Sequence, residues 1–143
     1  MIIAERDEIA ILEGARVELS GAFQTIGALH QEVGDRFEAE TGFRWDEGVQ
    51  LLYAANSVLS GGTPSRVEHG PGLPHIAVFA ISQSGWGESI QVGLTISAAR
   101  LLLRSCIGAL EHIDEPEFFT LTGAEVSEVR QVVELLDGLG LDE

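Results

Sequence analysis

A repeated segment is the feature that most constrains the fold of this chain. Residues 26–50 and 107–131 align without a gap at an offset of 81 and share 9 identities in 25 positions, where ordinary residue frequencies would give about one or two. The shared residues are Ile-Gly-Ala-Leu, then Phe, Thr-Gly, Glu and Gln in each copy. The repeat predicts that the chain is built of two similar halves.

In the first half, the pattern predicts a hairpin, a helix, a connector and a second helix. Alternation over residues 8–19, around Glu-Gly, indicates two short strands. Ser20 is then expected to cap the first helix, and Gly34 to end it. The second helix is predicted over residues 45–59. Its inward stripe is expected to hold Val49, Leu52, Ala55 and Val58.

The second half repeats this plan. Strands are predicted over residues 76–81 and 89–96, the latter with clean alternation. Ser97 is expected to cap the next helix, and Thr122 and Glu125 have the spacing of a capping box for the last one. That last helix is expected to turn inward Val126, Val129, Val133 and Leu136.

These elements predict an α+β fold in a single domain over residues 1–143. The halves cover about 1–59 and 76–140, and a loop rich in Gly and Pro over 60–75 joins them. We expect a small antiparallel sheet of about four strands, about four helices on one face and pseudo-twofold symmetry. The strand over 76–81 is apolar on both faces, which is typical of a central strand or of one covered by a partner.

The charge of the chain is strongly negative and unevenly distributed. The sequence has 23 acidic residues, 8 arginines and no lysine, for a net charge of -15. Residues 1–47 hold 11 acids and 4 bases, residues 97–143 hold 10 and 3, and the middle, 48–96, holds 2 and 1. Such a surface repels nucleic acid and anionic membranes, and it attracts a basic protein.

The only cysteine is Cys106, in an apolar run. A single cysteine excludes an intramolecular disulfide and fits a reducing compartment. No leader-like start and no run of about 18 apolar residues is visible in the sequence. The expected location is therefore cytoplasmic, and Cys106 is expected to be a buried hydrophobic residue rather than a nucleophile.

Motifs for catalysis or cofactor binding are missing from the sequence. His30-x-Glu32 and His112-x-Asp114 occupy nearly the same place in the two copies, but residues two apart do not share a helix face, so no metal site is expected. There is no nucleophile elbow, phosphate loop or dinucleotide fingerprint. We therefore expect no enzyme activity and no cofactor.

Two clusters of acids and one tryptophan are the candidate partner-binding residues. A large aromatic residue at a glycine-flanked hairpin tip, as predicted for Trp86, is typical of a binding anchor. The alternative is a ring that folds back onto its own sheet. The acids that would meet a basic partner are Glu38, Glu40, Asp114, Glu115 and Glu117.

The leading functional hypothesis is a non-enzymatic protein-binding module, specifically a bacterial immunity protein or antitoxin that neutralises a basic toxin. One alternative is a DNA mimic that inhibits a nucleic-acid enzyme. Another is a small-ligand carrier or enzyme with a pocket between the repeats, lined by His75, Phe79, Tyr53 and Cys106. A homodimer that uses the strand over 76–81 is a further alternative.

Overall fold

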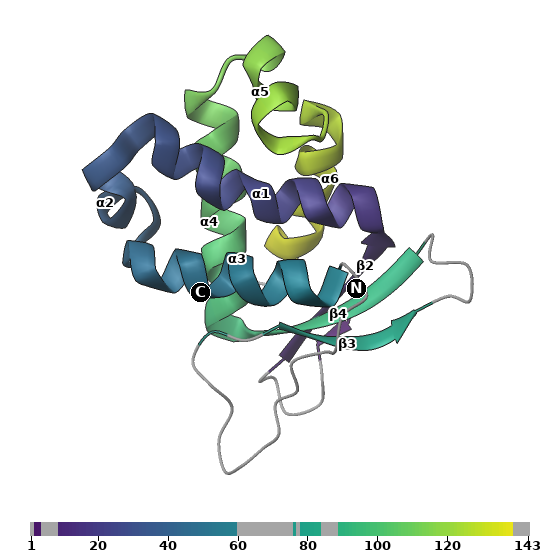
Figure 1. Ribbon diagram of the computed structural model, residues 1–143. Coiled ribbons are helices and arrows are strands. Elements are labelled where there is room, and N and C mark those ends of the chain that lie inside the picture. Colours follow the sequence, from purple (N-terminus) through teal and green to yellow (C-terminus); the bar gives the residue numbers. More distant parts are fainter. Residues whose placement is uncertain (1, 4–8, 60–75, 77, 84–88, 139–143) are drawn as a thin grey trace.

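The computed structural model describes residues 2–3, 9–59, 76, 78–83 and 89–138 and has an α+β fold, as predicted (Figure 1). Four antiparallel strands form one sheet, and the helices lie on one side of it. The buried apolar side chains of both halves form one continuous core. No helix in the described part of the chain is both long and apolar enough to span a bilayer.

The sheet has the strand order β1-β2-β4-β3. The outer strands are β1 (Ile2–Ile3) and β3 (Val78–Gln83), and the inner pair is β2 (Ile9–Ala15) and β4 (Ser89–Thr95). Alternate residues of the inner strands face the helices, so that Ala10 and Leu12 on β2 are fully buried. On β4 the corresponding buried residues are Ile90, Val92 and Leu94.

Each half contributes a long helix followed by two shorter ones. The first half contains α1 (Arg16–Val33), a 3-10 turn (Gly34–Arg36), α2 (Phe37–Thr41) and α3 (Trp45–Leu59). The second half contains α4 (Ile96–His112), α5 (Glu115–Thr122) and α6 (Val126–Asp137). Helix α4 is apolar and buried on most of its faces and crosses α1 at the centre of the molecule (Figure 1).

The hairpin predicted over residues 8–19 is wrong. Glu13 and Gly14 lie inside a straight strand, paired with Gln91 and Ile90 of β4, instead of forming a turn. Helix α1 then begins directly at Arg16, with Ala15 rather than Ser20 at its N-cap. Leu19 is buried one turn before Phe23, so this segment follows helical rather than strand periodicity. The predicted end of this helix at Gly34 is confirmed, with φ 58°.

Two caps of the second half differ from the prediction. Thr95, not Ser97, caps α4, and its side chain accepts a hydrogen bond from the Ala98 backbone N–H at 3.3 Å. The capping box of α6 pairs Glu125 with Glu128 rather than Thr122 with Glu125. The prediction failed because Thr122 bonds within the turn that ends α5.

Helices α2 and α5 were predicted only as connectors. Both are short, so their apolar periodicity is brief.

The residues predicted to face the core on α3 and α6 were partly wrong. In α3, Val49 is 44% exposed and Leu52 is half-buried, whereas Gly48 and Leu51 face the core. In α6 the buried residues are Val129, Val132 and Leu136, while Val126 and Val133 are partly buried.

The predicted strand over 76–81 lies at an edge of the sheet, because within the described strands β3 pairs only with β4. Its interpretation as a central strand is therefore wrong. The alternative, a strand covered by a partner, stays a prediction.

Corresponding parts of the two halves meet at the centre of the molecule. Leu12 pairs with Val92 in the middle of the β2–β4 ladder, and these residues occupy the same place in their strands. Thr25 of α1 and Cys106 of α4 are separated by the repeat offset, and their Oγ1 and Sγ atoms lie 3.5 Å apart. A twofold axis through the molecule would produce both contacts. Pseudo-twofold symmetry and descent from one duplicated unit stay predictions that these contacts support.

Candidate partner-binding surface

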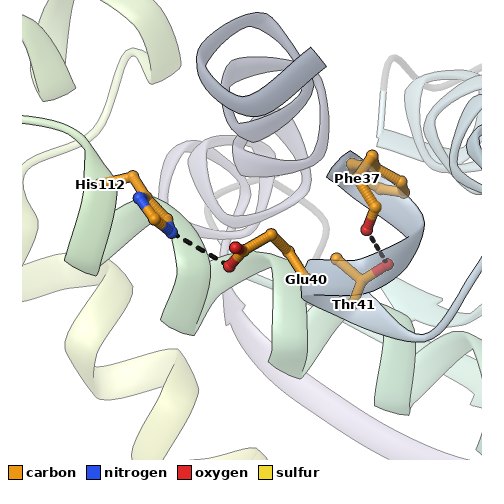
Figure 2. Close-up of polar contacts among 4 residues, drawn as sticks. All are labelled: Phe37, Glu40, Thr41 and His112. Atoms are coloured by element: carbon orange, nitrogen blue, oxygen red, sulfur yellow. Dashed lines mark hydrogen bonds and ion pairs between the residues drawn. The ribbon is translucent and has the colours of Figure 1, made fainter. Parts of the chain in front are cut away.

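Helix α2 is held in place by the turn that follows it. Gly42 adopts a left-handed conformation with φ 81°, and its N–H donates to the Glu38 carbonyl oxygen at 2.7 Å. The Thr41 hydroxyl donates to the Phe37 carbonyl oxygen at 2.9 Å (Figure 2) and accepts the Phe43 N–H at 3.1 Å. The turn therefore satisfies its backbone groups locally and fixes where the acids of α2 lie.

An arginine from the other half reaches the same turn. Arg104 of α4 donates from Nη1 to the Thr41 carbonyl oxygen at 3.2 Å. A Cβ atom at Gly42 would lie 2.7 Å from this Nη1 atom, so a larger residue would displace the Arg104 side chain, while the positive φ itself favours glycine.

Helix α5 ends in a turn of the same design. Gly123 has φ 79°, and its N–H donates to the Phe119 carbonyl oxygen at 2.8 Å. The Thr122 hydroxyl donates to the Phe118 carbonyl oxygen at 2.8 Å and accepts the Ala124 N–H at 3.1 Å. The two halves thus place α2 and α5 by the same local bonds.

The five acids of the predicted binding site lie on or directly before these two helices. We call them the acidic surface: Glu38, Glu40, Asp114, Glu115 and Glu117. All are exposed except Glu40, which is half-buried. Glu38, Glu115 and Glu117 stand near the N-terminal ends of α2 and α5, where a negative charge interacts favourably with the helix dipole.

One polar contact connects an acid of the first half with the second half. Glu40 Oε1 of α2 lies 3.0 Å from His112 Nε2, in the last turn of α4 (Figure 2). Asp114 and α5 follow His112 directly. The structure therefore brings Glu40 to the chain segment that leads into the other three acids.

Two further sequence predictions concern Trp86 and Cys106. Trp86, the predicted aromatic anchor, falls within residues 84–88, which lie outside the described part of the chain. Cys106 is buried, as predicted, and burial raises its pKa from 9.0 to about 12, against a smaller lowering effect of the Thr25 hydrogen bond. This thiol is therefore neutral at physiological pH, which argues against a nucleophilic role.

The pocket predicted between the repeats does not bring its described side chains together. Tyr53 is 80% exposed on α3, whereas Cys106 is fully buried at the crossing of α1 and α4. His75 lies outside the described residues. At the helix crossing a Cβ atom on Gly108 would lie 2.8 Å from Leu29 Cδ2, so the two helices are in close contact there.

The histidines considered as metal ligands have other contacts. The His30 ring stacks on the Trp45 ring, with centroids 3.8 Å apart and planes inclined by 9°, and lies edge-on to Phe37. His112 contacts Glu40. Throughout the described ranges, no three His, Cys, Asp or Glu side chains are grouped as a metal site. Trp45 is a packing residue, as predicted.

A second exposed feature was not predicted from the sequence. Val49 and Tyr53 lie one turn apart on the outer face of α3 and are 44% and 80% exposed. The signal was available, because the chain carries no Asp, Glu, Lys or Arg from Gly48 to Leu59. The exposed surface was missed because Val49 was predicted to face the core.

Comparison of the chain with protein-family models, with curated proteins and with solved structures finds no significant match.

Proposed function

We propose that this chain is a protein-binding module of the immunity-protein or antitoxin type, and that its acidic surface covers a basic protein. The observation that carries the proposal is the Glu40–His112 contact, which brings Glu40 of the first half to the end of α4, just before Asp114 and the acids of α5. The net charge of -15 and the absence of lysine support it. The cytoplasm is the compartment we propose, because the sole cysteine is a buried free thiol.

The acidic surface is suited to electrostatic steering of a basic partner. Glu38, Asp114, Glu115 and Glu117 are exposed, so they act mainly through long-range attraction that accelerates the encounter. Two arginines near α2 have other contacts: Arg44 pairs with Asp46 at 3.3 Å, and Arg104 donates to Thr41. Arg36, directly before α2, is exposed. We expect the association rate to fall about tenfold as salt rises from about 0.05 to 0.5 M.

The first experiment is capture of the partner from native lysate at low salt, followed by binding kinetics with paired variants. Glu115→Gln with Glu117→Gln removes two charges from the acidic surface. Glu134→Gln with Asp137→Asn removes two exposed charges from α6 and is the matched control. The proposal predicts a basic partner whose association slows about threefold or more with the first pair only. Equal effects of the two pairs would contradict it.

The DNA-mimic alternative is separated in the same assay. Its target is a nucleic-acid enzyme, and double-stranded DNA would compete with this chain for it. A basic partner that DNA does not displace supports the immunity or antitoxin assignment, whereas displacement by DNA replaces that assignment with the DNA mimic.

A further inference from the structure

The two longest charge-free runs of this chain form neighbouring elements. No Asp, Glu, Lys or Arg occurs over residues 48–65 or over 69–87. The described parts of these runs supply most of α3 and all of β3. In a chain with 31 such residues (23 acidic and 8 basic), this places an uncharged surface on one part of the fold.

Helix α3 and strand β3 lie side by side. Gln50 Nε2 on α3 donates to the carbonyl oxygen of Ile76, two residues before β3, at 3.1 Å. Figure 1 shows α3 running over β3 on the helical side of the sheet. The outer face of α3 and the edge of β3 therefore belong to one side of the molecule. We call this side the neutral face: Val49 and Tyr53 on α3, and the backbone edge of β3.

The helix part of the neutral face is the most exposed apolar feature of the described residues. Tyr53 is 80% exposed, and Val49 lies one turn before it. A tyrosine with this exposure is typical of binding surfaces, because it covers a large area with little side-chain entropy to lose.

The strand part of the neutral face has the properties of a pairing edge. Within the described strands β3 has one neighbour, β4. Exposed edges are usually protected by charged residues or proline, and the β3 sequence Val-Phe-Ala-Ile-Ser-Gln contains neither. An irregularity between Ala80 and Ser82 interrupts the register, whereas Val78 to Ala80 pair regularly.

We propose that the neutral face is the contact surface between two copies of this chain. Two copies with a charge of -15 each repel one another wherever their acids meet. They can approach closely only through a surface without charge. A basic partner would gain little electrostatic attraction from such a surface. A twofold axis perpendicular to the sheet would pair β3 with β3 of the second copy, and would place both α3 helices on the same side of the extended sheet.

Sedimentation equilibrium of the full chain tests this proposal. The wild type is expected to dimerise, and its dissociation constant is expected to fall as salt rises, because salt screens the repulsion. Tyr53→Glu and, separately, Val49→Glu should each raise the dissociation constant at least tenfold. Phe119→Glu is the matched control, since Phe119 is also an exposed aromatic residue, 56% exposed on α5. It should leave the dissociation constant unchanged.

Each outcome decides the matter. A wild type that stays monomeric at about 0.1 mM in 0.5 M salt overturns the proposal, as does dissociation by Phe119→Glu to the same extent as by Tyr53→Glu. Hydrogen exchange adds an independent reading: amides of β3 should exchange more slowly in the dimer than in the Tyr53→Glu monomer, and equal rates would contradict strand pairing. Salt should strengthen this dimer and weaken the binding of a basic protein, so the two interactions are distinguished by their salt dependence.

Discussion

In the turn after α2 and in the turn after α5, the same residue types make the same bonds. The threonine hydroxyl donates to the carbonyl oxygen of a phenylalanine at 2.9 Å in one turn and 2.8 Å in the other. The first turn of the next helix then holds a glutamate that accepts a backbone N–H, and this distance is 2.9 Å for both Glu47 and Glu128. These residues are also identities of the sequence repeat. The repeat therefore retains the positions that determine the local backbone.

One helix later, the outer faces of the two halves differ. Val49 and Tyr53 on α3 correspond in the repeat to Arg130 and Glu134 on α6. The stack of His30 on Trp45 also has no counterpart, since Glu111 and Val126 occupy those positions. The internal bonds of the unit are therefore shared, while its two outer surfaces differ enough to serve different partners.

A close contact between Gly21 and Ala124 has no equivalent between the corresponding residues of the repeat, and its loss should change the free energy of unfolding most. A Cβ atom at Gly21 in α1 would lie 2.1 Å from Ala124 Cβ and 3.3 Å from Ala124 Cα, and the corresponding positions hold Leu102 and Phe43. Gly21→Ala should therefore lower the free energy of unfolding by about 2–3 kcal/mol. Urea unfolding measures this change. A loss below about 0.5 kcal/mol would mean that α1 and the turn after α5 are not in close contact.

The shared turn should be equally important in both halves. Thr41→Val and Thr122→Val each remove a buried hydroxyl and leave one backbone N–H without its acceptor. Each should cost about 1.5–2 kcal/mol of unfolding free energy, and the two costs should agree within about 0.5 kcal/mol. Thr120→Val, at an exposed position of α5, should change little. Unequal costs would show that the two turns are only superficially alike.

How much of this fold could be predicted depends on how each residue signals its position. The bounds of α3 and the alternation of β4 were predictable, because apolar side chains mark the buried face. The inward stripe of α3 was not, since Gly48 faces the core with no side chain to mark it. A Cβ atom there would lie 3.1–3.2 Å from Ile26, Phe37 and Trp45.

The candidate surfaces were predictable to a different degree. Acid clusters are visible in composition, so the members of the acidic surface could be named from the sequence. Their connection through Glu40 and His112 could not, because those residues are 72 positions apart and meet only after α2 packs on α4. The Glu-Gly pair before Arg16 misled the strand prediction, since Gly14 tolerates a straight strand as well as a turn.

A pair of equivalent glycines distinguishes the two halves at the helix crossing. A Cβ atom at Gly27 would meet only Leu52 Cδ1 at 3.7 Å, whereas one at Gly108 would lie 2.8 Å from Leu29 Cδ2. Gly27→Ala should stabilise the fold by about 0.5 kcal/mol, because alanine favours helix. Gly108→Ala should destabilise it by about 1 kcal/mol, since Leu29 is fully buried and must shift. Thermal and urea unfolding check both signs, and a stabilising Gly108→Ala would show that Leu29 moves freely.

The last comparison concerns the position where the two long helices meet. Thr25 and Cys106 occupy equivalent places, and both side chains lie near the Ala22 carbonyl oxygen, at 2.6 Å from Oγ1 and 3.7 Å from Sγ. Of these two groups, only the Cys106 thiol ionises within an accessible pH range. The stability of the whole chain should therefore acquire an alkaline pH dependence from one half alone.

Below pH 9 the Cys106 thiol is protonated in both the folded and the unfolded chain. Above pH 9 the unfolded thiol ionises, while burial holds the folded pKa at about 12. Stability should therefore fall as pH rises, by about 1 kcal/mol between pH 9 and 10, relative to Cys106→Ser, which lacks this ionisation. Urea unfolding at the two pH values gives the difference, and a thiol reagent should react only after unfolding. Parallel stability curves for wild type and variant would show that this thiol is accessible to solvent in the folded chain.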